Sequence, residues 1–283
     1  HALVRRQRQM CIRDRVVADL PGVGENLQDH LDILSHYECT QPVTDARHMM
    51  GPLGWGFIKQ AIILTRWGVM KSGPGNDIGL AGLSFMKTDE NLDLPDIQMH
   101  FIGALLKDHG KTKPDQHCFS NHVCVLRPES RGYIALKSLD PTIPPIIQPN
   151  YLSAQKDLDV MVKGVKMSRE VINQKAFDQY RGAELHPGLD VQTDKEIEEF
   201  IRSHAETIYH PVGTCKMGND EFAVVDDKLR VRGVENLRVV DASVMPTLIG
   251  GNTNAPTIMI ADKISDHILG KEFLPPENFS NIN

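Results

Sequence analysis

The sequence predicts an α+β domain, an antiparallel sheet with helices, that is flanked at both ends by pieces of an α/β domain. Three observations lead to this fold class. Short segments with strand-like alternation follow one another through the first half of the chain. Two segments with apolar residues at helical spacing lie within residues 158–204. Near the carboxyl end, an apolar strand that finishes at Asp241 precedes a helix that begins near Pro256.

The predicted strands are short and are separated by turn residues. Residues 96–102 alternate apolar and polar side chains, as a half-buried strand does. Four prolines within residues 141–149 predict a rigid loop at that point. Further strands are expected at residues 16–19, 33–37, 122–126, 132–137 and 237–241.

Four helices are predicted, at residues 51–68, 158–172, 193–204 and 256–269. The third has the clearest start, because Thr193 and Glu196 have the spacing of a capping box. Pro256 suits the first turn of the last helix. The buried faces of the two central helices are expected to comprise Leu158, Met161, Val165, Ser168 and Ile172 in one, and Ile197, Phe200, Ile201 and His204 in the other.

Composition is that of a globular protein and excludes some functions. The 283 residues are 41% hydrophobic and 24% charged, enough for one large or two modest domains. A net charge of -6 argues against a nucleic-acid surface, which needs clustered positive charge. No apolar run approaches the ~20 residues needed to span a bilayer. We therefore expect neither a nucleic-acid partner nor a membrane span.

The five cysteines form no pair-spaced framework, which is typical of buried thiols. A bridge between two strands through Cys118 and Cys124 stays open at this stage. Residues 1–15 hold five arginines and show no helical or strand period. They fit a basic arm or a foreign segment, and we favour a foreign or artefactual segment.

Residues 210–218, His-Pro-Val-Gly-Thr-Cys-Lys-Met-Gly, place a histidine on a turn rather than along a helix. Pro211 restricts the backbone beside it and Gly213 releases it. Histidine titrates near neutrality, so His210 suits the removal of a proton from an alcohol. A zinc site at His204, His210 and Cys215 is the competing interpretation, but tetrahedral zinc prefers tighter ligand pairs than these.

Residues 250–257, Gly-Gly-Asn-Thr-Asn-Ala-Pro-Thr, bring backbone amides to the start of the last helix. A helix N-terminus carries partial positive charge and favours an anion. Asn254 offers both a donor and an acceptor, so it can orient an alcohol without titrating. A plain helix cap is the other explanation for this asparagine.

A third segment, residues 21–30, reads Pro-Gly-Val-Gly-Glu-Asn-Leu-Gln-Asp-His. Its glycines permit a sharp reversal, and Asn26, Asp29 and His30 are expected to tie the loop with hydrogen bonds. In order and spacing, the three segments resemble the glucose-methanol-choline (GMC) family of FAD-dependent oxidoreductases, from about Val16 to Leu269. Two stretches between residues 77 and 101 are similar to the insect glucose dehydrogenase branch of that family.

The resemblance implies roles for the candidate residues. His210 matches the family's catalytic base, and Asn254 matches the position that holds histidine or asparagine across the substrate alcohol. The implied reaction is the oxidation of an alcohol or sugar hydroxyl by hydride transfer to FAD, with a quinone, a similar acceptor or oxygen taking the electrons. It also implies secretion, in which case the sequon at Asn278 has meaning. The implied cofactor contacts are Asp241, Ala242, Gly251, Asn252 and Thr253.

The chain lacks the Gly-x-Gly-x-x-Gly turn through which the family binds the ADP half of FAD. We therefore expect a fragment without the amino-terminal dinucleotide-binding βαβ unit, which alone holds FAD poorly. Two other functions stay open: a cyanohydrin lyase on the same scaffold, and a non-catalytic incomplete copy. The expected segments are 1–15 (foreign), 16–30 (end of an FAD-domain segment), 31–205 (substrate-binding domain), 206–270 (catalytic motif with an FAD-domain segment) and 271–283 (tail).

Overall fold

The structure is a computed structural model that describes residues 17–44, 55–72, 80–104, 116–272 and 275. Two compact units emerge, and each is described by itself. Unit 1 holds the chain up to Asp29, then Ser130–Ser153, then everything from Tyr209. Unit 2 holds His30–Glu129 and Ala154–Ile208. The predicted substrate-binding domain, residues 31–205, stays a prediction; within that range, Ser130–Ser153 belongs to unit 1.

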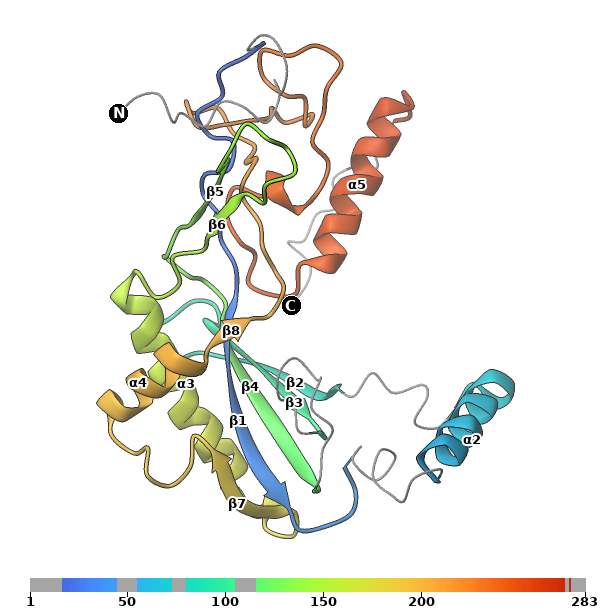
Figure 1. Ribbon diagram of the computed structural model, residues 1–283, viewed down its shortest axis with the longest axis vertical. Helices are drawn as coiled ribbons and strands as arrows, with labels where there is room; N and C mark the ends of the chain where they lie inside the picture. Colours follow the sequence, from blue (N-terminus) through green and yellow to red (C-terminus); the bar gives the residue numbers. More distant parts are fainter. Residues whose placement is uncertain (1–16, 45–54, 73–79, 105–115, 273–274, 276–283) are drawn as a thin grey trace. The chain divides into compact units, whose positions relative to one another are not determined.

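Unit 2 is built on a six-stranded antiparallel sheet (Figure 1). Its strands are β1 (Leu31–Cys39), β2 (Leu80–Met86), β3 (Ile97–Ile102), β4 (Cys118–Val125), β7 (Arg181–His186) and β8 (Glu206–Thr207). The order is β2-β3-β4-β1-β7, and β8 pairs with β1 off this path. The long central strands β1 and β4 pair from Asp32–Cys124 to Glu38–Cys118.

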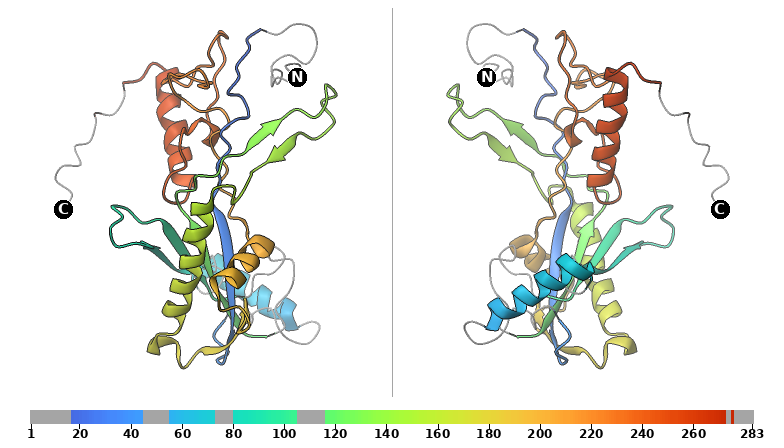
Figure 2. Two further views of the ribbon diagram at one scale, coloured as in Figure 1. Left: turned by 90° about the vertical axis from the view of Figure 1, so that its left-hand side faces the viewer. Right: turned by 90° about the vertical axis from the view of Figure 1, so that its right-hand side faces the viewer.

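Helix α3 (Gln155–Ile172) covers one face of this sheet (Figure 2). A Cβ atom on Gly164 would lie only 2.6 Å from a methyl group of Val123, so the helix and β4 approach each other closely. The five residues predicted for the buried face of this helix are all buried, which confirms that prediction.

Helix α4 (Asp194–His204) packs beside α3 and begins with the predicted capping box of Thr193 and Glu196. Its buried residues are Ile197, Phe200 and Ile201. The prediction that His204 joins this buried face is wrong, since His204 is exposed. It closes the helix with its ring stacked on Phe200 at a centroid distance of 4.8 Å.

Two further helical elements belong to unit 2. The 3-10 helix η3 (Lys175–Phe177) follows α3. Helix α2 (Trp55–Met70) leaves most of its side chains from residue 58 onward exposed, including Ile62, Leu64 and Val69. None of the described helices is long and apolar enough to cross a membrane.

Unit 1 has less regular structure. It holds the hairpin strands β5 (Tyr133–Ala135) and β6 (Ile146–Gln148), the 3-10 helix η4 (Ala242–Val244) and the helix α5 (Asn254–Ile268). A core of aliphatic side chains stabilises it, made up of Val224, Val225, Leu229, Val231, Val244 and Ile264. A second, smaller cluster comprises Val212, Met245 and Leu248.

Several sequence predictions differ from the structure. The proline-rich loop contains β6, because Ile146–Gln148 lies between its prolines and pairs with β5. No strand forms at residues 17–19, and residues 237–241 make only an isolated bridge between Arg238 and Arg230. Strands β2 and β7 were not predicted at all. The foreign segment and the sequon lie outside the described residues.

The disulfide left open between two strands is excluded by geometry. Cys118 and Cys124 both lie on β4, six residues apart. At about 3.4 Å per residue their Cα atoms are separated by roughly 20 Å. A disulfide needs Cα atoms within about 7 Å of each other. These two buried thiols therefore cannot be joined to each other.

Candidate functional site

His210 lies on an irregular turn of unit 1 and is half-buried. The preceding residue, Tyr209, has a left-handed backbone with φ of 64°, which is uncommon for a residue with a side chain and costs roughly 1–2 kcal/mol. The backbone N–H of His210 donates to Oδ1 of Asp29 at 2.9 Å. Burial lowers the pKa of His210 and the negative charge of Asp29 opposes this shift. The imidazole therefore favours its neutral, proton-accepting form near pH 7.

The far side of the turn is fixed by the segment at residues 21–30. Val212 and Gln28 exchange both of their backbone hydrogen bonds, at 2.8 and 3.1 Å. Gly213 has φ of 95°, and a Cβ atom there would lie 2.4 Å from the carbonyl oxygen of Asn26. Only glycine fits this position without a shift of the backbone.

The same segment also holds the loop that leads to Gly250. The side-chain amide of Asn26 donates to the carbonyl of Pro246 at 3.1 Å. The side chain of Gln28 donates to the same carbonyl at 3.2 Å and accepts from the N–H of Leu248 at 3.1 Å. The predicted hydrogen-bonding role of Asn26 and Asp29 is confirmed, and Gln28 shares it. His30 lies in unit 2, with Nε2 3.2 Å from the carbonyl oxygen of Leu126.

Asp241 and Ala242 lie where the His210 segment meets η4. The carboxylate of Asp241 accepts hydrogen bonds from both the backbone N–H and the hydroxyl of Ser243, and so caps η4. The N–H of Cys215 donates to the carbonyl of Ser243 at 2.9 Å. Asp241 is exposed, so it is accessible to a ligand.

Helix α5 begins at Asn254 with an open N-terminus. Its N-cap residue is Thr253, whose side chain makes no capping hydrogen bond, and the first turn contains no acidic residue. Asn254 is therefore not the helix cap, and its side chain is exposed. The Thr253 side chain thus leaves the amides of this turn without a cap from the N-cap residue, which fits an anionic ligand. Gly251 and Asn252 lie just before them.

These residues fit the flavin end of FAD by the chemistry of their donors. A reduced flavin is negative around N1 and C2=O, and the amides in the first turn of α5 offer the complementary partial charge. The structure places the five predicted cofactor contacts and both predicted catalytic residues in unit 1. It ties the His210 segment to the loop around Ala242 through Cys215, and to Leu248 through Gln28.

The zinc interpretation finds no support in the described residues. His204 belongs to unit 2, whereas His210 and Cys215 belong to unit 1. In the part of the chain that is described, no group of three or more histidine, cysteine or acidic side chains is placed to hold a metal ion.

A buried polar face in unit 2 was missed by the sequence reasoning. Directly paired residues of an antiparallel sheet share a face. Asp32 pairs with Cys124 and His100 with His122, which puts these side chains on the face opposite α3. Oδ2 of Asp32 lies 2.6 Å from Nδ1 of His122, and both residues are buried. Burial raises the pKa of Asp32, and the contact with His122 opposes that shift.

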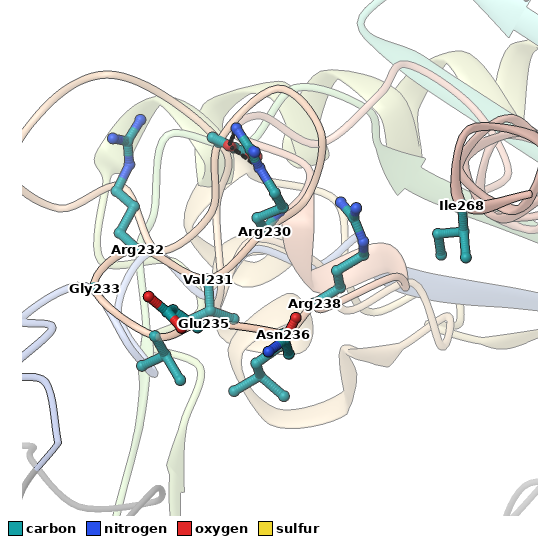
Figure 3. Close-up of a pocket in the computed structure, with 11 residues that line it drawn as sticks. Arg230, Val231, Arg232, Gly233, Glu235, Asn236, Arg238 and Ile268 are labelled. Carbon is teal, nitrogen blue, oxygen red and sulfur yellow. Dashed lines mark hydrogen bonds and ion pairs between the residues drawn. The ribbon is translucent and has the colours of Figure 1, made fainter. Parts of the chain in front are cut away.

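A pocket of about 880 Å³ in unit 1 contains none of the predicted site residues (Figure 3). Three arginines line it, and the side chains of Arg230 and Arg238 extend in the same direction. Each is already engaged: Arg230 with Asp226, Arg232 with the carbonyl of Gly218, and Arg238 with the carbonyl of Lys228. We therefore place the candidate site at His210 and not at this pocket.

Residues 128–261 match the family model described as GMC oxidoreductase. This region of the chain belongs to the GMC oxidoreductase family. Its fold is that of the substrate-binding carboxy-terminal part of these proteins.

Similar proteins include the oxygen-dependent choline dehydrogenases of Cronobacter sakazakii, 46% identical, and Pseudomonas savastanoi, 45% identical. Each alignment covers 260 residues, 92% of this chain and 45% of the relative. The chain thus spans about half the length of the relatives it matches.

Solved structures extend this likeness. Pyridoxine 4-oxidase from Mesorbium loti is 26% identical with a TM-score of 0.74, over 91% of this chain and 46% of that one. Formate oxidase from Aspergillus oryzae has a TM-score of 0.81 over 90% of this chain and 48% of that one. At 23% identity, the latter supports the fold alone.

Proposed function

We propose that the whole protein oxidises an alcohol with FAD as its cofactor, and that His210 removes the hydroxyl proton. The observation that carries this proposal is the His210 turn, which is held on both sides by residues 28–29. FAD, when bound, supplies the acceptor for the hydride that leaves the carbinol carbon.

Other steps of the proposed reaction are assigned to residues of this chain. The imidazole of His210 takes the proton, because burial keeps it neutral near pH 7. The exposed amide side chain of Asn254 orients the substrate hydroxyl. The backbone amides after Thr253 stabilise negative charge at the flavin. Gly251 and Asn252, just before them, contact the cofactor as well. Asp241 and Ala242 supply a further cofactor contact.

For the substrate, we infer choline or a similar cationic alcohol rather than a sugar. The support is the identity of 46% to an oxygen-dependent choline dehydrogenase. The likeness of residues 77–101 to glucose dehydrogenases gains no comparable support from the relatives found.

The substrate class is tested in the FAD-loaded whole protein with choline and with an uncharged alcohol of similar length. We expect choline to bleach the flavin with the higher kcat/KM. Equal use of both alcohols, or faster bleaching by glucose, would favour the sugar dehydrogenase assignment instead.

The electron acceptor is the second open point, and we infer oxygen from the names of the relatives, with a quinone as the alternative. Reoxidation of the reduced flavin by dissolved oxygen, measured against a soluble quinone, separates the two. A flavin that no alcohol bleaches, in a protein that releases cyanide from a cyanohydrin, would favour a lyase. The absence of both activities would point to a non-catalytic copy.

A further inference from the structure

We propose that Asp29 is the positioning residue of His210, and that one buried carboxylate fixes the turn that carries the imidazole. The proposal rests on the proposed role of His210 as the base. It gives Asp29 a role in catalysis, whereas the sequence predicted only hydrogen bonds within a loop for this residue.

The carboxylate of Asp29 bridges two distant segments of unit 1. Its Oδ1 accepts from the backbone N–H of His210 at 2.9 Å. Its Oδ2 accepts from the phenol of Tyr151 at 2.5 Å. The side chain is buried, with the residue only 8% exposed. Each oxygen therefore has a donor, and Tyr151 holds the carboxylate against the turn.

The turn needs this support because it lacks regular secondary structure. Tyr209 adopts a left-handed backbone immediately before His210, a conformation that persists only where the surroundings impose it. Gln28 and Val212 fix the far side of the turn through their paired backbone bonds. The bond to Asp29 fixes the near side. Loss of that bond frees the N–H of the residue that carries the imidazole.

Asp29 also acts on the imidazole through its charge. The carboxylate of Asp29 raises the pKa of this histidine against the effect of burial. The phenol of Tyr151 donates to the same carboxylate. The same negative charge stabilises the imidazolium that forms when His210 takes a proton. Substitutions of Asp29 can separate the effect of its hydrogen bond to His210 from the effect of its negative charge.

Asp29→Asn keeps an oxygen that accepts from His210 and removes the charge. In the FAD-loaded whole protein we expect its limiting rate of flavin reduction to stay within about threefold of wild type, because the geometry is kept. The acid limb of its pH profile should move to lower pH, because the pKa of His210 falls. Asp29→Ala removes the acceptor as well, and should lower the limiting rate by ~10–100-fold.

Matched controls come from the same unit. Tyr151→Phe keeps the charge of Asp29 but removes the donor that holds its carboxylate, so it should lower the limiting rate less than Asp29→Ala does. Asp220→Asn removes an exposed carboxylate that pairs with Lys216, and should change neither rate nor profile.

A second readout needs no flavin. In the 283-residue chain, an NMR titration gives the pKa of the His210 ring, identified by the signal that disappears in His210→Gln. Asp29→Asn should lower that pKa. Suppose that His210→Ala reduces flavin at the wild-type rate while Asp29→Asn still lowers the pKa of the His210 ring. That result would refute the role of His210 as the base and would support its contact with Asp29. An unchanged ring pKa in Asp29→Asn overturns the proposal, even if Asp29→Ala does not fold, and so does a wild-type rate in a folded Asp29→Ala.

Discussion

Gly213 and Asn26 approach so closely that no side chain fits between them. A Cβ atom at position 213 would lie 2.4 Å from the Asn26 carbonyl oxygen and 2.8 Å from its side-chain nitrogen. Asn26 in turn donates to the carbonyl of Gly213 at 3.3 Å. This contact joins the turn that carries His210 to the motif that supports it.

We therefore expect Gly213→Ala to destabilise the chain by about 1–3 kcal/mol, since it adds both a clash and a strained backbone at φ of 95°. Chemical denaturation measures the loss. Gly68→Ala is the matched control, because Gly68 lies inside α2 with nothing within 4 Å of a new Cβ. It should be neutral or stabilising by up to about 1 kcal/mol. Equal effects of the two substitutions would contradict the close approach.

Asn254 is the second prediction. Because Thr253 is the N-cap of α5, Asn254→Ala should cost little stability. In the FAD-loaded whole protein it should slow flavin reduction, and Asn254→His should keep part of the rate, since histidine also hydrogen-bonds an alcohol. Stopped-flow bleaching beside a thermal melt tests both points. A lowered melting temperature with unchanged bleaching would mean that Asn254 has only a structural role.

A third prediction concerns α4, in unit 2. The Thr193 side chain accepts from the backbone of Glu196, and the Glu196 carboxylate accepts from the backbone of Thr193. Thr193→Ala should therefore destabilise the chain by about 1 kcal/mol. Glu199→Ala, at an exposed position of the same helix outside the capping box, is expected to change stability by less than about 0.5 kcal/mol.

The pH dependence of flavin reduction gives a fourth prediction. His210 accepts a proton only in its neutral form, and burial lowers its pKa from the usual 6.5. The rate should therefore fall as the pH drops through the lowered pKa, with a midpoint below pH 6.5. The rate of flavin reduction measured against pH gives the midpoint of this acid fall. A midpoint above pH 6.5 would show that a group other than His210 controls flavin reduction.

Much of the fold follows from local sequence signals. Helices α3 and α4 were predictable because apolar spacing and a capping box act within a few residues of the chain. Strand β2 was not, because its alternation leaves Leu83 and Phe85 exposed, the reverse of the usual pattern. A strand was expected at residues 237–241 from apolar content alone, but a strand also needs a partner, and only an isolated bridge forms there.

The site was predictable where a motif defines it and not where packing does. His210 and Asn254 stand in segments with recognisable spacing. Gln28 gave no such signal, because its bonds to Pro246 and Leu248 join segments some 220 residues apart. Asp32 and His122 form a pair only through the register of β1 and β4. A polar residue among apolar neighbours in a predicted strand, such as Asp32 between Leu31 and Ile33, was the available hint.

The measurement that tests the central claim most directly is flavin reduction by His210→Ala in the FAD-loaded whole protein. His204→Ala serves as the control, since His204 is an exposed histidine of unit 2. Stopped-flow bleaching with choline should show a loss of ~10²–10⁴-fold for His210→Ala, the usual contribution of a general base. FAD should stay bound, and His204→Ala should match wild type. A wild-type rate in His210→Ala would contradict the account.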